Sequence, residues 1–179
     1  MSIRSLKEKL LNLETELEQS QMKVKKILAS RSLQTTSEFI YCYFTYSIVL
    51  NYMKQTSHLI MGNFHLVNIS DQNMQSPVIL LKINSKTEFN FSGKYKLANK
   101  ENQAYNFQWE RVMIDDLDQA THYCFKPTEN DVLRPNELLS FQSFQVVIPL
   151  DASINIEGFT YFNQNNDGVP ALNSIDISV

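Results

Sequence analysis

Glycine is scarce in this chain, with 4 residues in 179. Nucleotide-binding folds need glycine where backbone approaches a phosphate closely or adopts a positive φ. Neither GxGxxG nor GxxxxGK[ST] occurs in the sequence. The composition therefore argues against a nucleotide-binding enzyme.

Cysteine is nearly absent, since Cys42 and Cys124 are the only two. Two cysteines without CxxC spacing provide neither a disulfide-dense scaffold nor a zinc framework. We expect both to be free, buried thiols. Cofactors and metal ions are not expected.

The chain also has no large excess of charge of either sign. It contains 16 Lys and Arg and 19 Asp and Glu, which gives a net charge of -3. This balance does not suit a protein that coats nucleic acid, so no nucleic-acid partner is expected. Hydrophobic residues make up 43% of the chain, which is ample for a packed core.

Long apolar runs are missing as well. The longest stretch, from Phe39 to Met53, has about 15 residues, whereas about 20 are needed to cross a bilayer. Charges are scattered through the first 19 residues, where a signal peptide would have its apolar region. We therefore expect no membrane span, and synthesis in the cytoplasm without a signal peptide, followed by incorporation into a particle or surface assembly.

Residues 1–33 carry a heptad repeat that predicts an amphipathic coiled-coil helix. Its seam residues, with Ser20 as the one polar member, are Ile3, Leu6, Leu10, Leu13, Leu17, Val24 and Ile27. Leaving seven apolar side chains in water would forgo on the order of 10 kcal/mol, which favours self-association into a dimer or trimer. Packing of this helix on its own sheet is the alternative.

Residues 38–179 change periodicity and are typical of an all-β domain. Short runs of β-branched and aromatic residues predict nine strands, at 38–50, 59–69, 77–83, 87–92, 109–115, 121–126, 137–148, 154–162 and 172–179. Nine strands suffice for two sheets, and the polar segment 94–107 is interpreted as an insertion at the rim. We expect a β-sandwich, immunoglobulin-like or, alternatively, of the jelly-roll type.

Two strands change the parity of their apolar alternation. In residues 137–148 the change predicts a β-bulge near Gln142 or Ser143. A similar slip is expected between Leu66 and Val67.

Two stretches, LIMGNFHLVNISDQNMQSPVILLKI and VLRPNELLSFQSFQVVIP, resemble strands of bacterial immunoglobulin-like domains of surface and fibre proteins. The resemblance includes an L-x-P-x-E turn at Leu133, Pro135 and Glu137. Asn136 stands where such domains usually have glycine, and asparagine can occupy the positive-φ corner of a type II turn. The resemblance covers about 40 residues and implies a structural or adhesive module with no catalytic residues.

Candidate binding residues are mostly aromatic. Alternation in residues 39–48 places Tyr41 and Tyr43 on the face opposite Cys42 and Tyr46, and we expect the Cys42 face to be core. Tyr41, Tyr43 and Trp109 form the candidate contact surface, either for a ligand such as a sugar or for an adjacent protomer.

Two acidic or amide-rich runs look like partial calcium loops but are better explained as turns. MIDDLDQ supplies clustered carboxylates, and FNQNNDGVP supplies alternate ligands from Asn163 to Asp167 but has serine, Ser174, where a bidentate glutamate is needed. Catalytic motifs such as HExxH and GxSxG are absent.

These features together predict a non-enzymatic structural or attachment protein. A coiled coil would hold several β-sandwich heads together in a larger assembly, such as a phage-like fibre or a spore or cell-surface layer. The alternative is a carbohydrate- or small-ligand-binding module. The partner is expected to be a second copy of the chain together with a protein or a glycan.

Overall fold

The structure is a computed structural model that describes residues 40–51, 57–97, 107–129, 131–163 and 165–178. In these residues the chain is built of strands. Their bounds are β1 (Ile40–Val49), β2 (Ser57–Asn68), β3 (Met74–Gln75), β4 (Val78–Ser85), β5 (Asn90–Ser92), β6 (Lys96–Leu97), β7 (Trp109–Val112), β8 (His122–Pro127), β9 (Val132–Leu133), β10 (Leu138–Pro149), β11 (Ile154–Phe162), β12 (Asn165–Pro170) and β13 (Ile175–Ile177). The prediction of a mainly β protein is confirmed.

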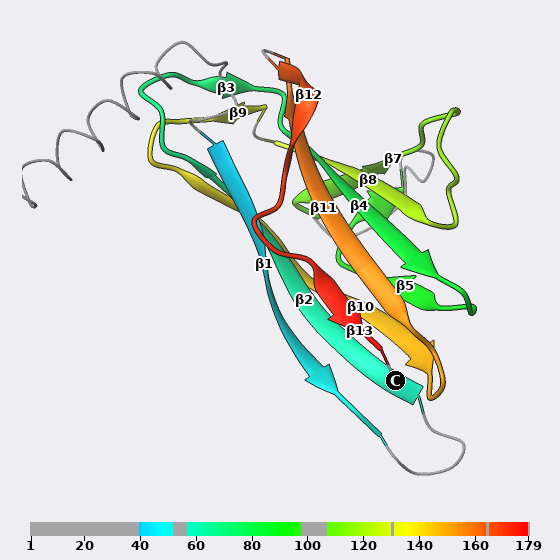
Figure 1. Ribbon diagram of the computed structural model, residues 1–179. Coiled ribbons are helices and arrows are strands. Elements are labelled where there is room, and N and C mark those ends of the chain that lie inside the picture. Colours follow the sequence, from blue (N-terminus) through cyan, green and yellow to red (C-terminus); the bar gives the residue numbers. More distant parts are fainter. Residues whose placement is uncertain (1–39, 52–56, 98–106, 130, 164, 179) are drawn as a thin grey trace, which may run out of the picture. The chain divides into compact units, whose positions relative to one another are not determined.

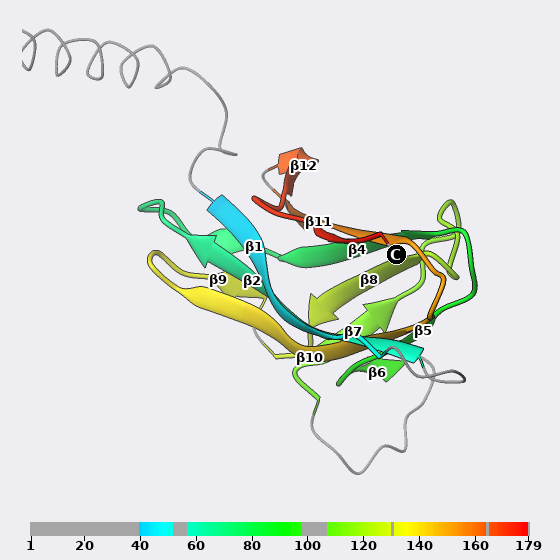
Figure 2. The same ribbon diagram turned by 60° about the horizontal axis from the view of Figure 1, so that its bottom comes forward.

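The strands form two large sheets and one small one. The first, called here the β1 sheet, has the order β1-β2-β10-β5. The second, the β4 sheet, has the order β12-β11-β4-β8-β7-β6, and β13 pairs with β11 beside β12. β3 and β9 form the small pair. Figures 1 and 2 show β1, β2 and β10 in one layer, with β11, β4 and β8 in the other.

The core lies between the two large sheets and is rich in aromatic rings. Phe125 of β8 stacks on Phe141 of β10 at 4.3 Å between ring centroids. Phe91 of β5 contacts Tyr123 of β8 at 4.1 Å. Such contacts join one sheet to the other. Rings of this size bury more apolar area than aliphatic side chains do, so they contribute strongly to the stability of this core.

A short segment after β12 closes one side between the sheets. Ala171 N–H donates to Gly158 O of β11 at 2.8 Å, and Leu172 N–H donates to Cys42 O of β1 at 2.8 Å. The Asn173 side chain then makes the two hydrogen bonds that a neighbouring strand would make with Phe44. Phe44 N–H donates to Asn173 Oδ1 at 2.8 Å, and Asn173 Nδ2 donates to Phe44 O at 3.1 Å. Backbone groups on the free edge of β1 are thereby satisfied.

Each of the nine predicted strands corresponds to an observed strand, with ends that differ by a few residues. The bulge in β10 is confirmed, since its register with β2 shifts between Phe141 and Phe144 and Ser143 has a φ of 59°. Asn136 has a φ of 60°, as expected for the turn before β10. Four observed strands were missed: the two-residue strands β3, β6 and β9, and β12, whose Asn- and Gly-rich residues were interpreted as part of a turn.

The expected slip in β2 is wrong. Burial alternates without interruption along β2 and ends at Asn68, which is fully buried. Its Nδ2 donates to Gln72 O and Leu133 O, and its Oδ1 accepts from Ser70. The hydrophobic pattern assigned the inward position to Val67. Asn68 takes it instead, because its buried side-chain amide has hydrogen-bond partners for both its nitrogen and its oxygen.

Tyr46 is a second correction. It was expected on the core side of β1, but it is 44% exposed, and of the residues after Phe44 in β1 only Ile48 packs against the core.

Candidate contact surface on the β1 sheet

The outer side of the β1 sheet has no charged side chain among its paired, outward positions. The register places these outward residues opposite one another on β1, β2 and β10. We call them the β1-sheet face: Tyr41, Tyr43, Thr45, Ser47, Val49, Leu59, Met61, Asn63, His65, Val67, Leu138, Ser140, Gln145 and Val147. Lys, Arg, Asp and Glu make up 20% of the chain, so fourteen positions without one set this face apart.

Four large apolar residues of this face are open to solvent. Leu138 is 55% exposed, Val49 43%, Met61 38% and Val147 37%. Soluble domains keep such groups apart unless a partner covers them. Their presence on one side of one sheet identifies a candidate contact surface.

Aromatic rings stack at one end of the face, where Tyr41 and Tyr43 lie on the outward side, as alternation in β1 predicts. Tyr41 and Tyr43 are stacked with centroids 6.0 Å apart. Tyr43 also stacks on His65 of β2 at 4.8 Å. Because the faces of these rings pack on one another, their edges and the tyrosine hydroxyl groups remain available to a partner.

A hydrogen-bonded network crosses the centre of the face. His65 Nε2 lies 2.9 Å from Thr45 Oγ1, and His65 Nδ1 lies 2.8 Å from Ser140 Oγ. Asn63 Nδ2 donates to Thr45 Oγ1 at 3.0 Å, and Ser143 N–H donates to Asn63 Oδ1 at 2.9 Å. Sequence reasoning missed His65, although its outward parity in β2 was readable.

Burial lowers the pKa of His65 below its ordinary value, because the surrounding groups disfavour the charged form. A neutral imidazole has one donor and one acceptor nitrogen, which suits a hydroxyl at each. The face therefore stays uncharged at neutral pH.

The bulge in β10 hollows the face next to the stacked rings, between them and the far end. A depression of about 470 Å³ is lined by residues of all three strands, among them Ser47, Met61, Asn63, Ser143 and Gln145. Ser143 has a φ of 59°, which turns the strand and opens the space beside Gly62. The face thus has a stacked end and a hollow beside it.

Trp109 does not belong to this surface. It is 2% exposed, makes an edge contact with Phe141 at 5.8 Å, and donates from Nε1 to Ser140 O at 3.0 Å. Its ring therefore packs in the core, and the expectation that it joins Tyr41 and Tyr43 is wrong. The segment before Trp109 is polar, so the local sequence did not indicate that its ring is buried.

The predicted oligomerisation residues lie outside the described residues. These are Ile3, Leu6, Leu10, Leu13, Leu17, Val24 and Ile27. Their role in a coiled coil stays a prediction.

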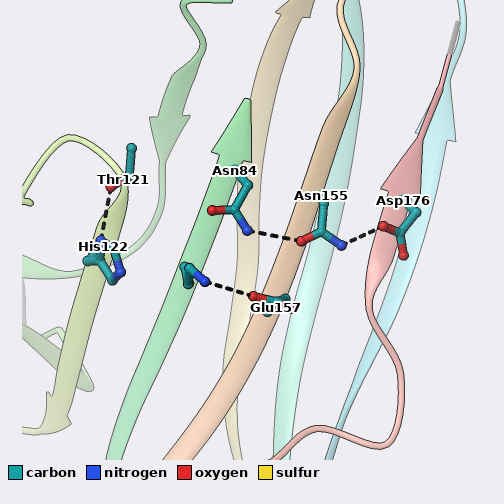
Figure 3. Close-up of polar contacts among 7 residues, drawn as sticks. Asn84, Thr121, His122, Asn155, Glu157 and Asp176 are labelled. Carbon is teal, nitrogen blue, oxygen red and sulfur yellow. Dashed lines mark hydrogen bonds and ion pairs between the residues drawn. The ribbon is translucent and has the colours of Figure 1, made fainter. Parts of the chain in front are cut away.

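The outer side of the β4 sheet is polar by contrast. Lys82 and Glu157 form an ion pair at 3.3 Å. Figure 3 shows a row across three strands, in which Asn84 Nδ2 donates to Asn155 Oδ1 and Asn155 Nδ2 donates to Asp176 Oδ1. Bonds from Ser174 and Asn155 lower the pKa of Asp176, so this carboxylate is ionised.

The polar row borders a cleft of about 490 Å³. Asn84, Lys86, Thr121, Asn155 and Asp176 are among its lining residues. Amide and carboxylate groups of this kind can bind the hydroxyl groups of a small polar ligand.

The two thiols are poorly suited to chemistry. Burial raises the pKa of Cys42 to about 12 and that of Cys124 to about 11. Since the thiolate is the nucleophile, both groups are inert in the folded chain. They are free, as expected.

No group of three or more His, Cys, Asp or Glu close enough to hold a metal ion occurs among the described residues. In the acidic run 115–118, Asp118 accepts from Ala120 N–H at 3.0 Å and from Thr121 Oγ1 at 2.9 Å. These bonds lower the pKa of Asp118 and belong to a turn. In the part of the chain that is described, no helix has the length and apolar character needed to cross a membrane.

Comparison with known proteins gives no family. No family model matches the chain, and no curated protein matches it. Two solved structures resemble it, both of a GH20 exo-β-N-acetylglucosaminidase from Vibrio harveyi: one in complex with N-acetylglucosamine, at TM-score 0.33, and one of an inactive mutant, at TM-score 0.32. Each is 14% identical over 79% of this chain, which spans 18% of the length of the enzyme chain.

Proposed function

We propose that this chain is a non-enzymatic structural or attachment protein. Residues 1–33 would form a coiled coil that holds two or three copies together, and each copy would present a β-sandwich head. The assembly would be a phage-like fibre or a spore or cell-surface layer. The observation that carries the proposal is the uncharged, partly apolar β1-sheet face.

An immunoglobulin-like sandwich is supported by the order of the strands. The order β1-β2-β10-β5 follows the A-B-E-D sheet of such domains, and β12-β11-β4 follows the G-F-C sheet. β8 and β7 extend the second sheet beside β4, where variable-type domains have extra strands. They follow β5 in the chain, whereas the extra strands of variable-type domains precede strand D, so the topology is a variant.

A contact role for the face is supported by its composition and by the unfavourable exposure of its apolar side chains to water. Interface centres are depleted in charged residues and enriched in tyrosine and methionine, as this face is. Full burial of an exposed apolar side chain is worth roughly 1.5 to 3 kcal/mol, and since those of this face are already about half buried, covering each contributes roughly half of that. Stacking of Tyr41, Tyr43 and His65 on one another favours a protein partner, because sugar binding needs open ring faces.

Several copies would make a weak contact effective. Once one head is attached, the second contact is intramolecular, and the linker between heads sets its effective concentration. A modest face on each head therefore suffices for attachment when copies are joined.

A test of the coiled coil uses the full chain and two matched variants. Leu13→Asp places a charge in the predicted seam, and Leu11→Asp places the same charge outside it. At low micromolar concentration, light scattering should give a mass of two or three chains for the wild type and for Leu11→Asp, and one chain for Leu13→Asp. A one-chain mass for the wild type would contradict the proposal, as would equal loss in both variants.

A second candidate is a carbohydrate- or small-ligand-binding module, which the polar row of the β4 sheet favours. The ionised Asp176 and the amides of Asn84 and Asn155 border the cleft there. Calorimetry with a panel of oligosaccharides tests it: saturable binding that Asp176→Ala abolishes would support this module over the structural one, and no binding would count against it.

A further inference from the structure

We propose that the β1-sheet face packs against the same face of a second copy of this chain. The two copies would be related by a two-fold axis that lies in the interface and runs across the strands at the level of Asn63. This inference rests on the proposed function in one respect, that the face is a contact surface, and it names the occupant.

Charge is the first reason to choose a second copy. Each chain carries a net charge of -3, so two copies repel unless they meet through a neutral region. The β1-sheet face is such a region, whereas the outer side of the β4 sheet carries Lys82, Glu157 and Asp176. A partner of opposite charge would find no charged group on the face to bind.

Shape is the second reason. In an isologous interface a residue of one copy meets a different region of the other, and the reverse contact also forms. Leu138 lies opposite Val67 in the register, at the stacked end, and Val147 lies opposite Leu59, at the other end. An axis at Asn63, midway between these two levels, places them over each other, so Leu138 of one copy faces Val147 of the other. The depression of about 470 Å³, which Met61 and Asn63 line, then lies beside the axis.

The same axis places matching groups together on β1. Tyr43 pairs with His65 and Ser47 pairs with Met61, so the axis brings Tyr43 of one copy over Ser47 of the other, at the depression. Tyr41 pairs with Val67 and Val49 pairs with Leu59, so Tyr41 likewise meets Val49. The ring edge of Tyr43, which the stack leaves open, would enter the depression, and its hydroxyl group would meet that of Ser47.

The area of the face predicts the strength of the contact. Strands of 10, 12 and 12 residues, at about 3.3 Å per residue and about 4.8 Å between strands, cover roughly 500 Å². Two such faces bury roughly 1,000 Å² in total, which is the lower limit for a specific interface. We therefore expect weak association of separate chains and firm lateral contacts between heads that a coiled coil holds close.

The experiment isolates the face from the coil by using the full chain with Leu13→Asp as its background. Sedimentation from low micromolar to several hundred micromolar should show a reversible change from one-chain to two-chain mass. Adding Leu138→Glu or Val147→Glu, at opposite ends of the face, should raise the dissociation constant at least tenfold, because each buries a charge. Met113→Glu is the control, since Met113 is 57% exposed and lies outside the face.

Each outcome decides the proposal. A one-chain mass for the Leu13→Asp background at every concentration would overturn it, as would association that survives both face variants or is lost equally with Met113→Glu. The coiled coil is judged separately, by the wild type against Leu13→Asp at low concentration. Failure of the face and failure of the coil are therefore distinguishable.

Discussion

Gly158 is the position where the packing of the two sheets can be tested most directly. It lies on β11 with its Cα facing the β1 sheet, and the rings of Phe44 and Phe64 rest on it. A Cβ at this position would lie 2.2 Å from Phe64 Cε2 and 2.8 Å from Phe44 Cζ. Both rings are buried, at 0% and 3% exposed, so neither can turn out to solvent.

The cost of Gly158→Ala can be worked out from these distances. Carbon atoms in contact prefer about 3.5 Å or more, so the Phe64 ring would have to move by roughly 1.3 Å inside a packed core. Inserting a methyl group into such a core costs about 1 to 3 kcal/mol. Alanine also reduces the freedom of the unfolded chain, which returns about 0.4 to 1 kcal/mol. The two terms differ by about 0 to 2.6 kcal/mol, and because the overlap at 2.2 Å is severe we expect a net loss in the upper half of this range, above about 1.3 kcal/mol, in the free energy of unfolding.

The assay is urea unfolding followed by fluorescence of Trp109, the only tryptophan in the chain. Gly93→Ala is the milder comparison, because a Cβ there would lie 3.0 Å from Phe141 Cζ, so the buried ring would have to move less than at Gly158, and a smaller loss is expected. Adding Phe64→Leu should offset part of the loss, so the double variant should be less destabilised than the sum of the two by on the order of 1 kcal/mol. Equal or greater stability of Gly158→Ala would refute the described packing of the two sheets.

Three further results are expected. Asn173→Ala should lower the free energy of unfolding by about 1 to 3 kcal/mol, because it leaves both backbone groups of Phe44 without their partner; urea unfolding measures this, and no change would contradict the bridging role. Since burial lowers the pKa of His65, the folded chain binds fewer protons than the unfolded one, so stability is full above about pH 6.5 and is lost as pH falls through the folded pKa. Urea midpoints at pH 8 and pH 5 should differ more in the wild type than in His65→Gln, and equal differences would sink this attribution. Finally, Cys42 and Cys124 should react with a thiol reagent at pH 8 only in urea, because burial raises their pKa to about 12 and about 11; rapid reaction of the native chain would show that they are accessible.

Local pattern was sufficient wherever one strand decides its own structure. Alternation placed Cys42 inside and Tyr41 outside, and the change of parity located the bulge at Ser143. Asn136 was assigned a positive φ from its place in the turn. Each of these properties depends on a few neighbouring residues, so the sequence contains it directly.

The predictions failed where contacts with residues far away in the sequence determine whether a side chain is buried. Asn68 occupies an inward position because Gln72 and Leu133 carbonyls accept its amide hydrogens, and no alternation of apolar residues signals this. Trp109 is buried because Phe141 and Ser140 O, about 30 residues away, receive its ring and its N–H. Such contacts have no local signature.

The sequence by itself determined that the chain is mainly β, where most strands lie, and which side of β1 faces the core. These follow from side-chain alternation with a period of two, which is a property of one strand at a time. Only the tertiary structure decided which strands are neighbours, and therefore that the uncharged positions of β1, β2 and β10 form one continuous face with a stacked end and a hollow beside it. Strand pairing joins residues that are up to about a hundred positions apart, and its free energy depends on how whole sheets pack, which no local pattern records.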